Sequence, residues 1–206
     1  AAGNPPPFAA AIARRKYTVT FDGGEAFDYH TNVRMRERFA YYRWDQGTVG
    51  TGSALRSLPA EELDKLFAST GMTPLEQHVM HAVSQLEGGF ESVNTYDTGY
   101  VSVGFIQFTT GDEGRGSLLE VMASEKKSSP DDFTRDFHNL GMDVNQANTL
   151  VVVDPSSGAE LTGADAVMKV IDDKRLVAIF QRAGRHSTPF RAAQISVAKS
   201  HYWPAN

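Results

Sequence analysis

One helix in this sequence ends at a pair of glycines, and a β-prone stretch follows it directly. Thr73 is a candidate N-cap, Pro74 fits the first helical position, and Glu76 completes a capping box. Glycine adopts the left-handed conformation of a helix C-terminus at little cost, so Gly88-Gly89 is expected to end this helix. The predicted buried face consists of Leu75, Val79, Ala82, Val83 and Leu86. Glu87 therefore falls on the last turn of a helix that packs against the core.

The stretch after the glycines is expected to form a small antiparallel hairpin or meander over residues 94–108. Thr98-Gly99 offers a turn, residues 100–105 are β-prone, and Gly104 allows the close approach of another backbone. A helix that runs into a small sheet predicts an α+β arrangement in this part of the chain.

The rest of the chain has mainly helical signals. The expected helices cover residues 8–16, 58–67, 117–126, 129–141, 163–172, 174–183 and 188–202, with Pro189 at the start of the last one. Residues 17–21 alternate as a short strand, and residues 47–53 form a glycine-rich connector. Residues 149–153 form either a short buried strand or a helix fragment, because periodicity does not separate the two. The fold class is therefore α+β, mainly helical, with a small antiparallel sheet.

Composition excludes several classes of function. The chain has 206 residues, 22% of them charged, with a net charge of −5 and no block of like charge, so neither nucleic acid nor an anionic membrane surface is an expected partner. The absence of cysteine excludes disulfides and thiolate chemistry. No apolar run reaches the roughly 20 residues of a membrane helix, so membrane insertion is not expected. His78 and His81 are spaced by three residues but lack a His-Glu-x-x-His pattern, so no metal or other cofactor is predicted.

The acidic residues around the glycine pair suit the cleavage of a glycosidic bond. This reaction needs an acid that protonates the leaving oxygen, and many enzymes add a second carboxylate that activates water or attacks directly. Glu87 at the end of a buried helix is the candidate acid, because apolar surroundings raise the pKa of a carboxyl group. Asp97 at the hairpin entrance is the candidate second carboxylate, or else an aspartate that only caps a turn. Ser102 on the return strand is expected to help hold a water.

These residues carry a family resemblance. Glu87-Gly88, Asp97-Thr98 and the strand Tyr100-Val101-Ser102-Val103-Gly104 resemble the active-site pattern of phage-type lysozymes in order and approximate spacing. Residues 104–111 are also similar to the strand and loop after the catalytic aspartate of family 46 chitosanases, and residues 104–107 resemble the glycine-to-glutamine strand of lytic transglycosylases. All three belong to the lysozyme-like superfamily. The resemblance covers residues 73–110 and implies a lysozyme-like fold whose small sheet lies beside the active-site cleft.

The sequence departs from these patterns at three places. The hydroxyl residue is serine where phage-type lysozymes have threonine, and the interval from glutamate to aspartate is shorter than in the chitosanases. The Glu-Ser pair of lytic transglycosylases occurs here as Glu91-Ser92, which makes Glu91 the alternative acid. Two adjacent glycines disfavour a helix that continues to Glu91, by about 1 kcal/mol each relative to alanine.

Several other residues are candidates for binding substrate. The predicted substrate-binding residues are Tyr96, Tyr100, Gln107, Asp112 and Arg115. The alternative for the two tyrosines is packing within the hairpin. The alternative for Asp112 and Arg115 is a position in a solvated loop. The aromatic and arginine residues between Glu25 and Asp45 form either a sugar-stacking surface or, more commonly for such mixtures, part of a core with outward-reaching guanidinium groups.

These expectations define one hypothesis and its alternatives. Residues 1–16 are expected to be an N-terminal extension and residues 17–206 a single lysozyme-like domain, with residues 17–72 as an accessory subregion. The expected activity is hydrolysis of β-1,4 linkages in an amino-sugar polymer, with peptidoglycan first. The alternatives are a chitosanase-like hydrolase, a lytic transglycosylase, or a non-catalytic glycan-binding or structural module of a cell wall or phage tail. Peptidoglycan as a partner implies export or the cell envelope, and the chain, which opens at Ala1, is expected to have been processed or to be a piece of a longer chain.

Overall fold

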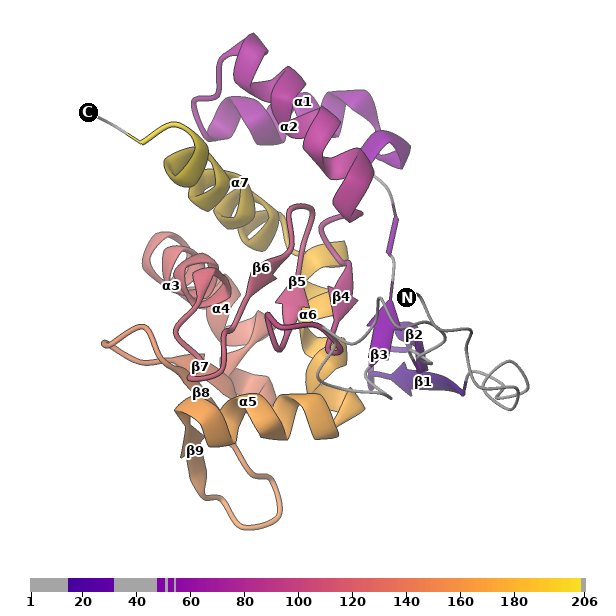
Figure 1. The fold of residues 1–206 in the computed structure, drawn as a ribbon, viewed down its shortest axis with the longest axis vertical. Helices are drawn as coiled ribbons and strands as arrows, with labels where there is room; N and C mark the ends of the chain where they lie inside the picture. Colours follow the sequence, from indigo (N-terminus) through magenta and orange to yellow (C-terminus); the bar gives the residue numbers. More distant parts are fainter. Residues whose placement is uncertain (1–14, 32–47, 51, 54, 205–206) are drawn as a thin grey trace, which may run out of the picture.

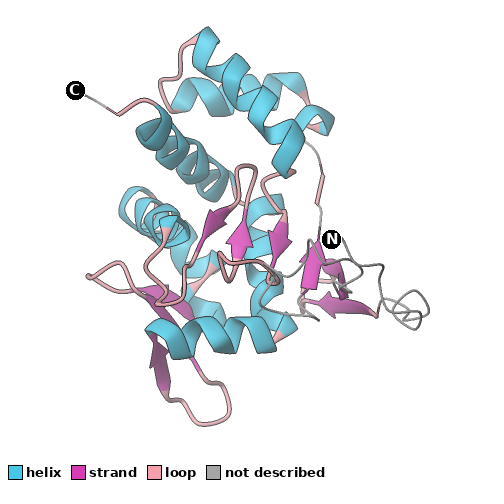
Figure 2. Cartoon of the chain, in the orientation of Figure 1, coloured by secondary structure: helices cyan, strands magenta, loops and turns pink. Residues whose placement is uncertain are grey.

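The computed structural model describes residues 15–31, 48–50, 52–53 and 55–204, and within them the chain is α+β with two antiparallel sheets and seven α-helices (Figures 1 and 2). The strands are β1 (Lys16–Thr20), β2 (Ala26–Thr31), β3 (Thr48–Gly50), β4 (Val93–Asn94), β5 (Ser102–Val103), β6 (Phe108–Thr109), β7 (Met142–Val144), β8 (Leu150–Val153) and β9 (Glu160–Thr162). The helices are α1 (Ala60–Ser69), α2 (Pro74–Glu87), α3 (Ser117–Ser128), α4 (Pro130–Asp136), α5 (Gly163–Asp172), α6 (Lys174–His186) and α7 (Thr188–Tyr202), with 3₁₀ turns at η3 (Leu55–Ser57) and η4 (His138–Leu140).

The larger sheet is a six-stranded meander in which each strand pairs with the next in sequence, in the order β1 to β6. The expected strand over residues 17–21 is confirmed as β1, and the expected meander over residues 94–108 is confirmed as β4 to β6. The prediction of a connector at residues 47–53 is wrong over residues 48–50, which form β3 between β2 and β4. A three-residue strand is too short to show alternation, so the pairing on both sides determines it rather than its own propensity.

The smaller sheet lies in the second half of the chain and has the order β7-β8-β9. Its central strand β8 resolves the open alternative at residues 149–153 in favour of a strand. Three of its four residues are buried, as expected of a continuous apolar run. Strands β7 and β9 are missing from the sequence prediction, since each has only three residues.

Helix α6 lies at the centre of the molecule. It packs against β1, β2 and β4 of the larger sheet and against α4, α5 and α7 (Figure 1). Its buried positions extend around most of the helix, which is typical of a helix enclosed by other elements. At Gly184 a Cβ atom would lie 2.3 Å from the carbonyl oxygen of Phe90, so the absence of a side chain there lets α6 approach the segment before β4.

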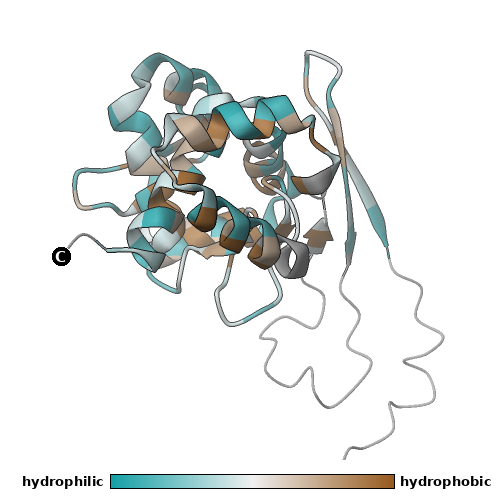
Figure 3. Cartoon of the chain, turned by 90° about the horizontal axis from the view of Figure 1, so that it is seen from above, coloured by the Kyte–Doolittle hydropathy of each residue, from teal (hydrophilic) through white to brown (hydrophobic). Residues whose placement is uncertain are grey.

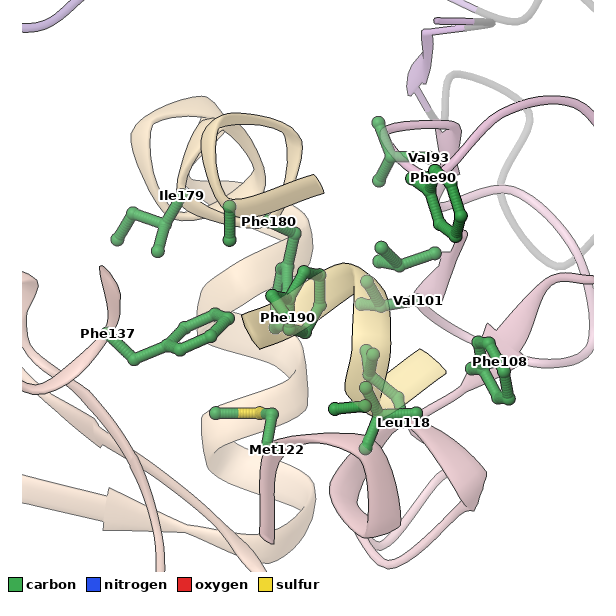
Figure 4. Close-up of a cluster of buried hydrophobic side chains, with 14 of the residues drawn as sticks. Phe90, Val93, Val101, Phe108, Leu118, Met122, Phe137, Ile179, Phe180 and Phe190 are labelled. Carbon is green, nitrogen blue, oxygen red and sulfur yellow. The ribbon is translucent and has the colours of Figure 1, made fainter. Parts of the chain in front are cut away.

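The hydrophobic core joins the meander to the helices around α6. Phe137 packs its ring against Phe180 of α6 at 5.7 Å and against Phe190 of α7 at 5.2 Å between centroids. Figure 4 shows this cluster with Leu118 and Met122 of α3 beside it, and with Phe90 and Phe108 on the side of the meander. The sheet carrying the candidate site is thus anchored to a packed helical core.

The buried face predicted for helix α2 is wrong at Leu75 and Ala82, while Val79 and Val83 are half-buried and the side chain of Leu86 lies outside the described part of the structure. Leu75 is 73% exposed and Ala82 is exposed, whereas Met80, outside the predicted face, is fully buried. The helix packs against η3 at the edge of the molecule, and neighbours cover only part of its circumference. Figure 3 shows the hydrophilic segments on the outward sides of the helices. Tertiary position has therefore overridden the periodicity.

Most other helix predictions are confirmed. Helices α1, α3, α5, α6 and α7 occupy their predicted places, and Pro189 starts α7 as expected. The predicted helix over residues 129–141 is interrupted: α4 ends at Asp136, and η4 then leads to the left-handed Gly141. The helix predicted over residues 8–16 falls outside the described residues, except that Lys16 begins β1.

The aromatic and arginine mixture between residues 25 and 45 is described only in part. Phe27 and Tyr29 on β2 are buried, so these two rings pack in the core and are not a sugar-stacking surface. Residues 32–45 lie outside the described part of the chain. No helix among the described residues is long and apolar enough to span a membrane.

Candidate active site

The helix that carries Glu87 begins and ends as its sequence predicts. The Thr73 backbone N–H donates to Glu76 Oε2 at 2.8 Å, and the Glu76 N–H donates to Thr73 Oγ1 at 3.3 Å, so the capping box is formed. At the other end Gly88 has φ +109°, and the helix ends at Glu87. The backbone of Glu87 therefore stands at the junction with the sheet, while its side chain lies outside the described part of the structure.

The segment between Glu87 and β4 is held by close backbone packing. A Cβ atom on Gly89 would lie 1.7 Å from the carbonyl oxygen of Ser53, so only glycine fits this position. Gln194 of α7 is fully buried and binds the segment from the other side: its Nε2 donates to the Phe90 carbonyl oxygen at 3.0 Å, and its Oε1 accepts from the Phe105 N–H at 3.4 Å. Gln194 thus fixes the spacing between the end of α2 and the β5–β6 turn.

Glu91, the alternative acid, is 3% exposed and fully engaged. Its Oε1 accepts from the Ser53 N–H at 2.5 Å, and its Oε2 accepts from Arg185 Nε at 2.7 Å. The Arg185 guanidinium also lies over the ring of Phe27, 4.4 Å from its centroid. Both carboxylate oxygens therefore bind protein donors, and Glu91 joins the segment before β4 to α6.

Asp97 lies in the β4–β5 loop, where its Oδ1 is fixed by two donors. The Gly99 N–H donates to this atom at 2.9 Å, and the Ser102 hydroxyl donates to it at 3.3 Å. A Cβ atom on Gly99 would lie 2.9 Å from Ser102 Oγ and 3.1 Å from Asp97 Oδ1, so glycine is needed for the turn to close over the serine. No hydrogen bond from the described residues reaches Asp97 Oδ2. The structure thus unites the predicted Asp97 and Ser102, and Asp97 also caps the turn.

Strand alternation separates polar from apolar side chains in the three central strands. Asn94 pairs with Ser102 in the ladder, and Ser102 pairs with Thr109, so these three polar residues share one face. The opposite face directs Val93, Val103 and Phe108 into the core, where all are buried. Ser102 is only 1% exposed, because the turn at Gly99 covers it. Its hydroxyl therefore positions Asp97 and does not reach into open space.

Gln107 lies at the opposite end of β5 from Asp97 and is bound to the same polar face. Its Oε1 accepts from Asn94 Nδ2 at 2.7 Å, and its Nε2 donates to the Gly104 carbonyl oxygen at 2.9 Å. Asn94 Oδ1 is buried without a hydrogen-bond partner. A continuous polar row therefore connects Asp97, Ser102, Asn94 and Gln107.

Two candidate residues adopt the left-handed region that non-glycine residues rarely occupy. Tyr100 has φ +71° and Gln107 has φ +57°, and they lie on either side of β5. Such conformations cost about 1–3 kcal/mol each and persist where the surrounding structure enforces them, frequently at functional sites. Tyr96 and Tyr100 are both partly exposed in the β4–β5 loop.

The remaining predicted residues lie in the loop between β6 and α3. This loop starts beside the Asp97 turn, since the Gly111 N–H donates to the Gly99 carbonyl oxygen at 3.1 Å. Asp112 is exposed next to that contact. Arg115 turns toward the smaller sheet, where its Nε donates to Thr149 Oγ1 at 3.2 Å. Asp112 is therefore near the Asp97 turn, and Arg115 is bound elsewhere.

The two histidines of α2 do not form part of a larger ligand set. His78 is exposed, and the ring of His81 packs on Phe67 with 5.2 Å between centroids. Within the part of the chain that the structure describes, no group of three or more His, Cys, Asp or Glu residues is arranged to hold a metal ion.

Two residues that build the site are absent from the sequence prediction. Arg185 and Gln194 come from α6 and α7, about ninety residues after the segment they bind. Gln194 had one sequence signal, a polar residue within the apolar face of the last predicted helix. Comparison with protein-family models, curated proteins and solved structures found no match, so the candidate site is defined by its own residues and geometry.

Proposed function

We propose that this protein is a glycoside hydrolase with a lysozyme-like fold that cleaves β-1,4 linkages in an amino-sugar polymer, with peptidoglycan as its first substrate. The observation that carries the proposal is the fixed carboxylate of Asp97. One of its oxygens is held by Gly99 and Ser102, and the other accepts no hydrogen bond from the described residues. A carboxylate positioned in this way is suited to remove a proton from an attacking water.

The topology supports a division of labour between two acids. Glu87 ends the helix before β4, and Asp97 follows β4, so the two residues flank this strand at opposite ends (Figure 1). Two carboxyl groups roughly 6.5–9.5 Å apart leave room for a water and lead to inversion at the sugar carbon. We assign Glu87 as the acid and Asp97 as the base, an assignment that predicts a separation of their carboxyl groups in this range.

The reaction then balances as follows. Glu87 donates its proton to the glycosidic oxygen while the bond from that oxygen to the sugar C1 breaks. A water attacks C1 from the opposite face, and Asp97 takes the proton that the water loses. The products are two sugar chains with free ends, a Glu87 carboxylate and a protonated Asp97, which exchange protons with solvent before the next cycle.

The backbone around β5 supports a role in binding for Tyr100 and Gln107. Both residues hold left-handed conformations next to the polar row that ends at the proposed base, Asp97. We assign Tyr96, Tyr100 and Gln107 to substrate binding, with Asp112 at the rim of the site. Arg115, bound to Thr149, is the weakest member of this set.

Glu91 is a poor candidate for the acid in this proposal. An acid must direct an oxygen at the substrate, whereas both oxygens of Glu91 accept hydrogen bonds from the protein. One of these contacts is an ion pair, with 2.7 Å between Glu91 Oε2 and Arg185 Nε. We therefore assign Glu91 a structural role.

One observation favours a second substrate. The net charge of −5 would attract a cationic polymer, so a chitosanase-like hydrolase is the second candidate. Peptidoglycan as substrate places the protein outside the cytoplasm or in the cell envelope.

Turnover, measured by solubilised fragments for insoluble peptidoglycan and by new reducing ends for chitosan, tests the proposal. Glu87→Gln and Asp97→Asn should each lose about 10²- to 10⁴-fold in rate, the usual contribution of a positioned acid or base. A wild-type rate in Glu87→Gln would refute its assignment. Activity that survives Asp97→Asn but not Glu87→Gln would instead indicate a lytic transglycosylase, which uses a single acid. Wild-type protein that binds but turns over neither polymer would indicate a glycan-binding module.

A further inference from the structure

A groove of about 290 Å³ lies where the C-terminal end of α7 meets the β5–β6 turn and the start of α3. Its lining comes from these three elements: Ile106, Gln107, Phe108, Ser117, His201 and Tyr202. The volume is close to the lower end of the range of ligand pockets, roughly 300 Å³. Its size therefore suits a small unit such as one sugar ring.

The groove contains an exposed aromatic ring. Tyr202 is 49% exposed, and it is the only exposed Phe, Tyr or Trp side chain in the described part of the chain. Tyr202 is the last residue of α7, and the centroid of its ring lies 5.9 Å from that of Trp203. An exposed aromatic ring packs against the apolar face of a sugar ring, and polar groups beside the aromatic ring bind the hydroxyls of the sugar.

The polar residues of the groove are held in place by the fold. The His201 ring is fixed by Glu120, with 2.6 Å between His201 Nε2 and Glu120 Oε2. Ser117 Oγ accepts from the Thr109 N–H at 3.1 Å, which leaves its own O–H to donate to a ligand. The groove therefore offers a ring, a hydroxyl and an imidazole at defined positions.

The groove shares one lining residue, Gln107, with the polar row of the proposed active site. Gln107 is a lining residue and also the end of the polar row that runs through Asn94 and Ser102 to Asp97. In an antiparallel meander the β5–β6 turn lies at the same end as the start of β4, next to the end of α2. A polymer bound across the meander toward this end would reach the groove.

We infer that this groove is an accessory sugar-binding subsite in which Tyr202 stacks on a pyranose ring of the polymer beyond the cleavage point. The inference rests on the proposed function for the identity of the polymer. The groove itself is a binding site whether or not the bound chain is cut.

Binding and turnover measured separately test this inference. The full chain carrying Glu87→Gln is co-sedimented with insoluble peptidoglycan, alone and combined with Tyr202→Ala or Tyr202→Phe. Tyr202→Ala should weaken binding about tenfold, the effect of losing one aromatic contact, and Tyr202→Phe should bind as the parent does. Val153→Ala, at an exposed apolar residue of β8 in the smaller sheet, is the matched control and should bind normally. Thermal unfolding verifies that each variant is folded.

The outcomes separate the two proposals. Tyr202-dependent binding in a protein whose wild type shows no turnover would refute the proposed hydrolase and support the subsite. The subsite alone would be refuted if the wild type is active and Tyr202→Ala changes neither measurement. These are turnover in the otherwise wild-type chain and binding in the Glu87→Gln chain. A Tyr202→Phe loss as large as that of Tyr202→Ala would also refute ring stacking, because phenylalanine keeps the ring.

Discussion

Two glutamates are buried in this molecule to nearly the same extent, but their partners are of opposite kinds. Glu91 is 3% exposed and faces the Arg185 guanidinium at 2.7 Å. Glu125 on α3 is 0% exposed and faces a second carboxyl group, Asp136 at the end of α4. The same side chain at the same depth thus has a cation for a neighbour in one place and an acid in the other.

This difference sets the protonation state that each site prefers. Burial, together with the adjacent Asp136 carboxylate, raises the pKa of Glu125 to about 9. No donor group of the described residues reaches Glu125 Oε2 or Asp136 Oδ2, whereas both oxygens of Glu91 are engaged. Glu125 is therefore built into the fold as a neutral acid, whereas Glu91 has a cation and a backbone N–H as its partners. Burial alone therefore does not identify an acidic residue as catalytic.

The largest loss of stability expected from a single substitution comes from removing the cation of the first pair. Arg185→Leu leaves the Glu91 carboxylate buried without its counter-ion, which should lower the free energy of unfolding by about 3 kcal/mol. Urea denaturation at pH 7 measures this change. Arg182→Leu, one turn earlier on α6, breaks a partly exposed pair with Glu25 and should cost less than about 1 kcal/mol. Equal losses in the two variants would show that burial does not distinguish the pairs.

The second effect is a pH dependence that comes from Glu125. Its pKa in the folded protein is above the ordinary value of 4.5, so folding favours the protonated form. That stabilisation is fully present below about pH 4.5 and is lost as pH rises toward 9, by roughly 1.4 kcal/mol per pH unit at most. Glu125→Gln should remove this slope and be more stable than wild type at pH 8. Urea midpoints at pH 5 to 9 that run parallel in the two proteins would contradict it.

The third prediction applies the same substitution to the first glutamate. Glu91→Gln places an amide donor against either the Ser53 N–H or Arg185, so it should cost about 1–2 kcal/mol at pH 7. Glu125→Gln has the opposite sign at alkaline pH. Turnover per folded molecule of Glu91→Gln should stay within about threefold of wild type, because Glu91 is assigned no catalytic role. A loss of 10²-fold in rate with a small loss in stability would restore Glu91 as the acid.

The helices could be predicted from the sequence where local signals determine them. The capping box of Thr73 and Glu76 and the proline that starts α7 are local, and both are confirmed. The buried face of α2 could not be predicted, because neighbours distant in sequence decide which side they cover. Short strands such as β3 failed for a related reason, since their pairing partners provide most of their stability.

In the candidate site, too, local contacts could be predicted from the sequence and contacts between distant segments could not. Asp97, Gly99 and Ser102 lie within five residues of each other, and their contacts follow from a tight turn that the sequence shows. Arg185 approaches Glu91 only because α6 packs against the segment before β4. The sequence therefore identified Glu91 as an acidic candidate but not the cation that makes it structural.

The smallest expected effect comes from Ser187, whose hydroxyl donates to Glu125 of the Glu125–Asp136 pair. The Ser187 hydroxyl lies 3.4 Å from Glu125 Oε1 and also accepts from the Phe190 N–H at 3.2 Å as the N-cap of α7. Ser187→Ala should lower the free energy of unfolding by about 1 kcal/mol, mainly through the lost cap. The Ser187 hydrogen bond lowers the pKa of Glu125, so its loss should extend the decline of stability to higher pH. Ser128→Ala, at an exposed hydroxyl of α3, should change stability by less than about 0.5 kcal/mol and leave the pH profile unchanged. A pH profile of Ser187→Ala displaced to lower pH would show that the hydroxyl does not stabilise the charged form of Glu125.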